Sequence, residues 1–396
     1  MNARKIVEHA RKYKKSVRIA SKSIRSIPIL ERLLTRYPDV INGIMAFSAT
    51  EACWLSNRNI CNDILIGYPI WHVTDIEEVY HCIQSKNIDH VDNSPNYITL
   101  TVDCIQHVQH LDSIIDRLNA IAKHKTKIPV CIDFDLSYSV QIINLWFGVR
   151  RSPLRTINDV EKVLQHVIQS SNLKLDGLLG YEAQIAGLGD NHQCFLQKPM
   201  DTLIRTLKHY SSLDVLSRRK SIVEHTKKIL KSNGFTLRFV NGGGTGSINF
   251  TCTDLSVNEI TVGSGLFSPL LFDEYKDLKP FHPSLFFACQ IIRQPTLCIY
   301  TCLGGGYSAS GKTGQDKSPQ PYLLQGAQLD PNEGAGEVQT PVWCKKKQLQ
   351  LGDAIFFRHA KAGEICERFN DIYVIKQGKF LQDRYKTYRG EGMCFL

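Results

Sequence analysis

Short runs of β-branched and other apolar residues recur along the first 280 residues, and helical spacing of apolar residues follows most of them. This alternation predicts a series of strand–helix units. Eight runs within about 270 residues fit a (β/α)8 barrel, which typically has about 250 residues. A doubly wound open sheet is the alternative. The predicted strands are Val17–Ala20, Ile44–Phe47, Ile64–Gly67, Tyr97–Val102, Val130–Phe134, Leu175–Gly180, Leu237–Val240 and Glu259–Val262.

The segments between these strands are long enough for crossover helices, of which Ala49–Asn57, Asn158–Ser170 and Thr202–Gly234 are examples. Residues 1–15 read as a basic helix directly before the first strand, so the strand that usually precedes such a helix is missing. A gene start placed too late, loss of one edge of a second domain, or a mitochondrial transit peptide would each explain this. The transit peptide is disfavoured because Val17–Lys22 already belongs to the fold.

After Pro280 the pattern changes to strand-like pieces between loops rich in Gly, Pro and Gln, with little helical periodicity. This change predicts a barrel over residues 1–278 and a β-rich domain over residues 279–396, with the boundary near residues 276–284. The strand-like pieces are Phe286–Ile292, Leu297–Cys302, Ala354–Phe357 and Asp371–Ile375.

Composition excludes several classes of protein. Apolar residues make up 43% and charged residues 22% of the chain, which is typical of a globular protein and excludes disorder. The longest apolar stretch, Leu285–Ile292, is far too short to cross a bilayer. The 13 cysteines form no CxxC pair and no apolar secretory segment opens the chain, so we expect free thiols in a reducing cytoplasm.

The net charge of +10 invites a nucleic-acid interpretation, but many of the cations lie near the start of the chain. Elsewhere the two signs are interspersed, and basic and aromatic residues do not alternate in the way that stacks bases. We therefore expect no nucleic-acid partner. Attraction for a small anion fits the charge equally well.

Functional groups of such barrels lie where the strands end, on the C-terminal face. The loops after the seventh and eighth strands are rich in glycine, and barrels commonly bind phosphate there. The sequence thus predicts a phosphate site facing a lysine on the first strand. The strand ends present Lys22, Thr50, Tyr68, Asp103, Asp133, Tyr181, the Asn241–Gly246 turn and the Gly263–Gly265 loop.

Lys22 lies among other cations, Arg18 and Arg25, and such surroundings with partial desolvation favour the free amine that Schiff-base chemistry requires. A solvated surface lysine is the alternative. Asp133 and Asp135 alternate with apolar residues, so both are expected to face the barrel interior. They are candidates for a general base and its hydrogen-bond partner, or for buried carboxylates with satisfied hydrogen bonds.

Two further motifs lie in the C-terminal part. Gly306–Thr313 matches the Walker A pattern, but the following Gly314–Pro321 cannot form the helix whose N-terminus binds phosphates, so we expect no nucleotide-hydrolysing loop. His359, Glu364 and Cys366 lie close together in sequence and offer ligands suited to zinc or manganese. The alternative is a turn with an exposed histidine and a buried cysteine.

Taken together, several stretches resemble the fold-type III pyridoxal-phosphate enzymes (alanine racemase, D-threonine aldolase and D-serine dehydratase), and most closely the amino acid deaminase/aldolase subgroup. The resemblance covers nearly the whole chain. The matching stretches are RIASKSIRS (18–26), GVRRSPLRT (148–156), GLLGYEAQIAGLGD (177–190), RFVNGGGTGS (238–247), VGSGLFSPLLFD (262–273), LGGGYSASG (303–311), EGAGEVQTP (333–341) and RHAKAGEICERF (358–369).

The resemblance implies that Lys22 forms a Schiff base with pyridoxal phosphate and that Arg150 or Arg151 lies near the cofactor ring. Tyr181 and Gln184 match the place where relatives carry a tyrosine and a nearby histidine, so the glutamine puts a histidine acid/base role in doubt. The other cofactor-binding residues that it implies are Asn241, Gly243, Gly244, Thr245, Gly263, Ser264 and Gly265.

His359 matches a metal-ligand histidine of the aldolase and dehydratase branch. The second ligand of that branch lies two residues later, where this chain has Lys361. Cys366 or Glu364 would then replace it, unless the metal is bound differently. A divalent ion of this kind would act as a Lewis acid near the substrate hydroxyl.

The resemblance thus implies a pyridoxal-phosphate lyase acting on a D-3-hydroxy amino acid, by retro-aldol cleavage to glycine and an aldehyde or by deamination to a keto acid. A racemase that works without metal, or a non-catalytic pyridoxal-phosphate-binding protein, are the alternatives. It further implies a small amino acid substrate and a cytoplasmic homodimer, with the second domain of one subunit over the barrel mouth of the other. We expect no membrane partner.

Overall fold

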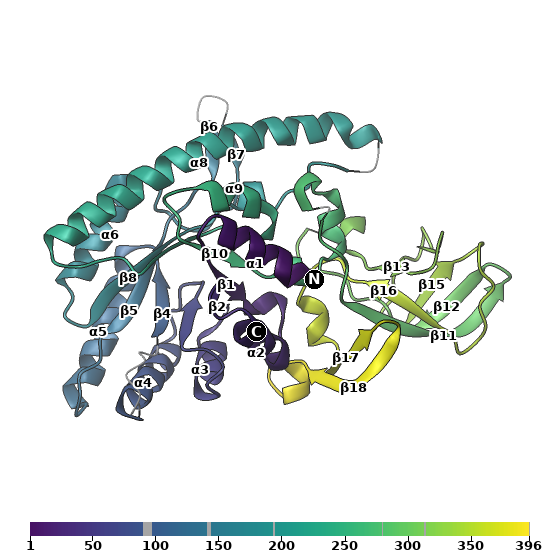
Figure 1. Cartoon of the computed structure of the whole chain (residues 1–396), viewed down its shortest axis with the longest axis horizontal. Coiled ribbons are helices and arrows are strands. Elements are labelled where there is room, and N and C mark those ends of the chain that lie inside the picture. Colours follow the sequence, from purple (N-terminus) through teal and green to yellow (C-terminus); the bar gives the residue numbers. More distant parts are fainter. Residues whose placement is uncertain (90–96, 141–143, 193–194, 279, 313, 396) are drawn as a thin grey trace.

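The computed structural model describes residues 1–89, 97–140, 144–192, 195–278, 280–312 and 314–395. Figure 1 shows a barrel surrounded by helices on one side of the molecule and a β-rich part at the other. Thr313 of the Walker-like motif and Lys279 at the predicted boundary lie outside the described residues. In the described part, none of the helices has the length and apolar character needed to span a bilayer.

Eight parallel strands close into a barrel in the order β1-β10-β9-β8-β5-β4-β3-β2. This closure confirms the predicted (β/α)8 architecture over the open sheet, and each predicted strand overlaps an observed one. The register between first and last strands, such as Val17 opposite Ile260, completes the ring. The strands are β1 (Ser16–Ala20), β2 (Ile41–Ala46), β3 (Asp63–Ile66), β4 (Tyr97–Val102), β5 (Ile128–Asp133), β8 (Leu173–Gly180), β9 (Phe239–Gly242) and β10 (Glu259–Val262).

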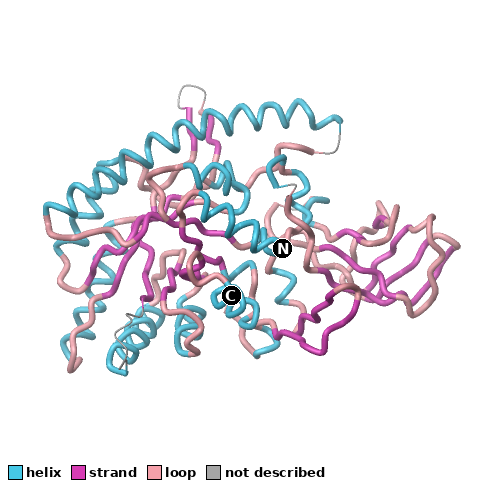
Figure 2. The backbone as a smooth tube through the Cα atoms, in the orientation of Figure 1, coloured by secondary structure: helices cyan, strands magenta, loops and turns pink. Residues whose placement is uncertain are grey.

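Helices surround these strands, as Figure 2 shows in cyan around magenta. Each helix begins at a capping residue that the sequence supplies, or buries an apolar face against the barrel. Thr156 and Asp159, for example, form a reciprocal capping box that satisfies backbone donors at the start of α6. The helices are α1 (Asn2–Lys12), α2 (Ile27–Arg36), α3 (Ala49–Asn57), α4 (Val73–Asp89), α5 (Ile105–Ile121), α6 (Ile157–Gln169), α7 (Ala183–Ala186), α8 (Lys198–Ser232) and α9 (Ile248–Thr253).

The N-terminal helix is part of this packing. Ile6, Val7 and Ala10 of α1 are buried, and the Asn2 side chain donates hydrogen bonds to the carbonyls of Leu266 and His282. The predicted basic helix before the first strand is therefore confirmed as an element that packs on the barrel.

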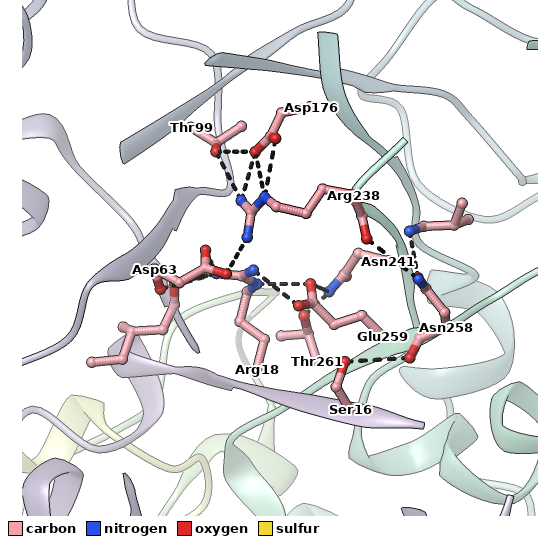
Figure 3. A network of polar contacts seen from close by, with 12 residues as sticks. Ser16, Arg18, Asp63, Thr99, Asp176, Arg238, Asn241, Asn258, Glu259 and Thr261 are labelled. Carbon is pink, nitrogen blue, oxygen red and sulfur yellow. Dashed lines mark hydrogen bonds and ion pairs between the residues drawn. The ribbon is translucent and has the colours of Figure 1, made fainter. Parts of the chain in front are cut away.

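A network of buried charges fills the barrel where its strands begin (Figure 3). The fully buried Arg18 pairs with Glu259 at 2.7 Å and with Asp63 at 2.9 Å. Arg238 pairs with Asp176 at 2.6 Å. Because each charge has an opposite partner and further hydrogen bonds, burial of the network is tolerated. The open end is the one where the strands finish.

The C-terminal part contains a six-stranded antiparallel sheet in the order β13-β16-β11-β12-β15-β14, and a separate hairpin of β17 and β18. Phe287 and Phe357 stack with ring centroids 5.2 Å apart in its core. The four predicted strand pieces all overlap observed strands, while the exact domain boundary stays a prediction. The strands are β11 (Phe286–Thr296), β12 (Ile299–Leu303), β13 (Gln320–Tyr322), β14 (Gln328–Leu329), β15 (Gln339–Trp343), β16 (Ala354–Arg358), β17 (Asp371–Lys376) and β18 (Lys379–Lys386).

Two features were not predicted. A small hairpin of β6 (Tyr138–Val140) and β7 (Leu145–Phe147) follows β5. Helix α8 is a single helix of 35 residues that begins at Lys198, earlier than its apolar pattern indicates. Figure 1 shows α8 running along the outside of the barrel.

Candidate active site

A cavity of about 700 Å3 lies at the open end of the barrel. Residues from the strand ends and from the loop after β16 line it together, so both parts of the chain contribute. Its charged and aromatic lining includes Lys22, Tyr68, Asp103, Asp133, Arg151, Tyr181 and Lys361. All of the predicted strand-end residues except Thr50, Gly242 and Gly265 therefore meet in one cavity.

Lys22 lies in a short 3-10 turn directly after β1, and its amine is 2.6 Å from the Tyr68 hydroxyl. The Lys22 carbonyl accepts a hydrogen bond of 3.0 Å from Arg25 Nε, and Arg25 pairs with Glu367 at 2.5 Å. Gly363, which has a φ of +88°, packs against the same carbonyl so closely that any Cβ there would collide with it. The backbone of Lys22 is thus fixed from both sides, while its amine lies in the cavity.

The two glycine-rich loops after β9 and β10 line the cavity next to each other. Gly265 N–H donates a hydrogen bond of 3.0 Å to Thr245 Oγ1, and a Cβ at Gly265 would collide with the Thr245 side chain. Gly243 has a φ of +82°, a conformation that favours glycine. Ser264 Oγ lies 3.2 Å from Ser23 Oγ, which links the second loop to the turn that carries Lys22. These contacts fit the predicted phosphate site.

A buried group of charges stabilises the first of these loops. Glu182 accepts hydrogen bonds from Ser247 Oγ at 2.7 Å and from the Gly243 N–H at 3.3 Å. The fully buried Arg219 pairs with Glu182 and, at 2.7 Å, with Asp254. Sequence reasoning missed Glu182 and Arg219, because only the tertiary fold brings α8 onto this loop.

Tyr181 and Arg151 lie together on the cavity wall, with the guanidinium 5.7 Å from the centre of the tyrosine ring. Burial raises the pKa of Tyr181 to about 12, so its hydroxyl stays protonated near neutral pH. Arg150 instead lies over the Trp146 ring at 4.5 Å and is absent from the cavity lining. Of the two predicted arginines, Arg151 is the one that faces the site.

Gln184 and Asn241 already have protein partners. Gln184 is buried outside the cavity lining and donates hydrogen bonds to the Leu136 carbonyl at 2.7 Å and to Ser211 Oγ at 2.8 Å. Asn241 lines the cavity, but its side chain donates to Glu259 at 2.8 Å and accepts from Thr261 at 2.9 Å. Both side chains are thus arranged to support neighbouring elements.

Asp133 and Asp135 both line the cavity, as expected from their alternation with apolar residues. Burial, followed by the nearby Asp103 carboxylate, raises the pKa of Asp133 to about 8. Asp135 instead pairs with Arg155 at 3.0 Å and accepts a hydrogen bond from Ser137 Oγ. The cavity therefore contains one carboxyl that is mostly protonated at neutral pH.

The three residues predicted to bind a metal do not form a group. His359 is buried, with Nδ1 3.2 Å from the Leu285 carbonyl and Nε2 without a hydrogen-bond partner. Cys366 is buried, and burial raises its pKa to about 12. Glu364 accepts hydrogen bonds from Ser310 N–H at 2.7 Å and Ser310 Oγ at 2.6 Å, so both of its oxygens are in use.

In the described ranges, the one set of three His, Cys, Asp or Glu residues with ligand atoms within 4.8 Å of one another is Asp103, Cys104 and His107. Nδ1 of His107 pairs with Asp103 at 2.9 Å, and the backbone N–H of His107 donates to Cys104 Sγ at 3.4 Å. These atoms therefore satisfy one another at the start of α5. The residues His359, Glu364 and Cys366 are not such a set of three, and a metal site at His359 stays a prediction.

Comparison with solved structures identifies the fold. The D-threonine aldolase from Filomicrobium marinum matches with a TM-score of 0.76 at 15% identity, covering 98% of this chain and 92% of that chain. The D-threo-3-hydroxyaspartate dehydratase from Delftia sp. HT23 matches with a TM-score of 0.68 at 14% identity, covering 98% and 93%. An alanine racemase from Clostridium difficile 630, in complex with cycloserine, matches with a TM-score of 0.60 at 15% identity, covering 98% and 96%.

These proteins are fold-type III pyridoxal-phosphate enzymes, and this chain has their fold over nearly its whole length. The resemblance predicted from the sequence motifs is thus confirmed at the level of the fold. No family model matches the sequence. No curated protein matches it either.

Proposed function

We propose that this protein is a pyridoxal-phosphate-dependent enzyme that acts on amino acids, with Lys22 as the attachment point for the cofactor aldehyde. One observation carries the proposal: the Lys22 amine and two interlocked glycine-rich loops line the same cavity at the open end of the barrel. The loops bind the cofactor phosphate, since glycine lets backbone N–H groups approach an anion closely.

The bound cofactor supplies an electron sink that makes the α-carbon of an amino acid acidic. The residues of this chain then orient the substrate and move protons. Tyr68, in hydrogen-bond contact with the Lys22 amine, orients that amine. Arg151 attracts the substrate carboxylate, and the protonated Asp133 donates a hydrogen bond or a proton within the cavity.

Within this class we propose a lyase acting on a D-3-hydroxy amino acid, because the aldolase and the dehydratase match this chain with higher TM-scores than the racemase does. Retro-aldol cleavage removes the proton of the substrate hydroxyl and breaks the bond between the α- and β-carbons, whereas dehydration removes the α-proton and breaks the bond between the β-carbon and the hydroxyl oxygen. In both reactions the electron pair released at the α-carbon is the one that the cofactor would accept.

An absorbance spectrum tests the cofactor assignment. The purified protein loaded with pyridoxal phosphate should show the visible band of a lysine-bound cofactor, and Lys22→Ala should abolish that band. Lys86→Ala, a change at a lysine on the outer helix α4, is the control that should keep it. A band that persists in Lys22→Ala contradicts the assignment.

Product analysis then identifies the reaction. With D-threonine we expect glycine and an aldehyde from an aldolase, or a keto acid and ammonia from a dehydratase, and neither from the L-isomer. Formation of L-allothreonine, the product of inversion at the α-carbon of D-threonine, without cleavage would instead support the racemase alternative. A loaded protein that converts none of D-threonine, D-serine or their L-forms supports the non-catalytic alternative.

A further inference from the structure

The C-terminal part of the chain contributes one wall of the cavity, and Lys361 lies on that wall. It is two residues before Gly363, which packs against the Lys22 carbonyl, so the loop that carries Lys361 contacts the turn that carries Lys22. Its side chain lines the cavity and is 44% exposed. Lys361 and Lys22 thus line one cavity from different parts of the chain.

The ammonium of Lys361 is fixed by two contacts. It donates to Ser310 Oγ at 2.8 Å and pairs with Glu364 Oε1 at 2.9 Å. Ser310 in turn donates both its N–H and its hydroxyl to Glu364. Ser310 belongs to the glycine-rich stretch that matches the Walker A pattern. Through Ser310 this stretch holds Lys361 and Glu364 in place.

The ammonium of Lys361 can still donate a hydrogen bond to one more acceptor. An ammonium has three donors, of which Ser310 and Glu364 use two, so one N–H remains for a further acceptor. The Glu364 carboxylate balances the positive charge, so the group as a whole is neutral. A neutral oxygen acceptor, such as a hydroxyl, therefore fits this position better than a second carboxylate.

The same group disfavours a divalent ion. Both Glu364 oxygens are already in use, the His359, Glu364 and Cys366 ligand atoms form no group, and a fixed ammonium nearby repels a dication. Lys361 also stands where the family resemblance places the second metal ligand.

From this geometry we propose that Lys361, held by Ser310 and Glu364, binds the side-chain hydroxyl of the substrate and replaces a divalent metal in that role. Lys361 is thus a specificity-determining residue for amino acids that carry a hydroxyl on the β-carbon. The proposal rests on the proposed function, because it requires the substrate to be bound at Lys22.

A binding measurement on the cofactor-loaded protein tests this. The apparent dissociation constants of D-threonine and of D-2-aminobutyrate, which has the same carbon skeleton without the hydroxyl, are measured from the initial change in visible absorbance after rapid mixing, before D-threonine is converted. We expect the wild type to prefer D-threonine. Lys361→Met should reduce that preference by roughly tenfold or more, because a hydrogen bond from a charged donor is lost.

Two matched variants complete the test. Lys361→Arg, which keeps a charged donor, should restore part of the preference, and Lys347→Met, at an exposed lysine of the same part of the chain, should leave it unchanged. Metal analysis after incubation with zinc or manganese and dialysis should find far less than one ion per chain. Chelator treatment should leave the D-threonine dissociation constant unchanged.

Each contrary result has a distinct meaning. One tightly bound ion per chain that is lost in His359→Ala overturns the proposal, as does an unchanged preference in a folded Lys361→Met protein. If the wild type shows no cofactor band, the proposed function itself fails, and this inference fails with it. A normal band with equal affinity for both ligands overturns only the inference about Lys361.

Discussion

Asp133 illustrates how single residues in the cavity are adjusted by their surroundings. Its pKa of about 8, raised by burial and then by Asp103, keeps a proton available where most carboxyls are ionised. Tyr181, with a pKa of about 12, also stays protonated. The cavity that Lys22 lines therefore offers two neutral hydrogen-bond donors, which suits proton transfer at neutral pH.

Asp133→Asn should make the stability of the native state less dependent on pH. A carboxyl whose pKa rises on folding stabilises the native state while it is protonated, so wild-type stability falls as pH increases from 3.8 towards about 8. Asparagine does not ionise, so the variant should gain stability relative to the wild type by up to about 1.4 kcal/mol per pH unit in this window. Thermal unfolding across the window measures the difference.

Asp277→Asn, at an exposed aspartate, is the control and should follow the wild type. A stability difference between Asp133→Asn and the wild type that does not change with pH would contradict the pKa assigned to Asp133.

At the scale of elements, the strands of the barrel were predictable because each is a short apolar run followed by a polar or glycine-rich turn. The β6–β7 hairpin was not predicted because each of its strands has only three residues, too few to show an alternation of apolar and polar positions. Helix α8 begins earlier than predicted because Pro199 is tolerated in the first helical turn. Met200 and Leu203 are exposed there, so the apolar pattern does not mark a buried face.

The loop after β16 offers a prediction at the same scale. Gly363 and Gly378 both have a positive φ, but a Cβ at Gly363 would collide with the Lys22 carbonyl, whereas a Cβ at Gly378 would meet open space. Both alanine variants should lose about 1 kcal/mol of stability from backbone strain. Only Gly363→Ala should also displace the Lys22 turn and weaken cofactor binding by roughly tenfold or more.

Equilibrium titration with pyridoxal phosphate, followed by visible absorbance, measures the difference between the two variants. Equal cofactor affinity in Gly363→Ala and Gly378→Ala would show that the contact does not position Lys22.

At the scale of the whole molecule, the two parts of the chain build one site, and this sets the limit of prediction from sequence. Lys22, Tyr181 and the glycine loops were found because they follow strand ends. The Glu182–Arg219 pair and the Ser310–Lys361–Glu364 group were not found, because their members come together only through long-range packing. Closeness in sequence likewise does not bring the ligand atoms of His359, Glu364 and Cys366 together into one set of three.

The contact between Gly363 and Lys22 has a consequence for synthesis of the protein. A ribosome releases all eight barrel strands before it reaches the segment that completes the surroundings of the reactive amine. N-terminal domains generally begin to fold during translation, so a barrel can form while its lysine is still incompletely enclosed. If Lys22 carries the cofactor as proposed, binding of that cofactor in its final geometry has to wait until the polypeptide is almost finished.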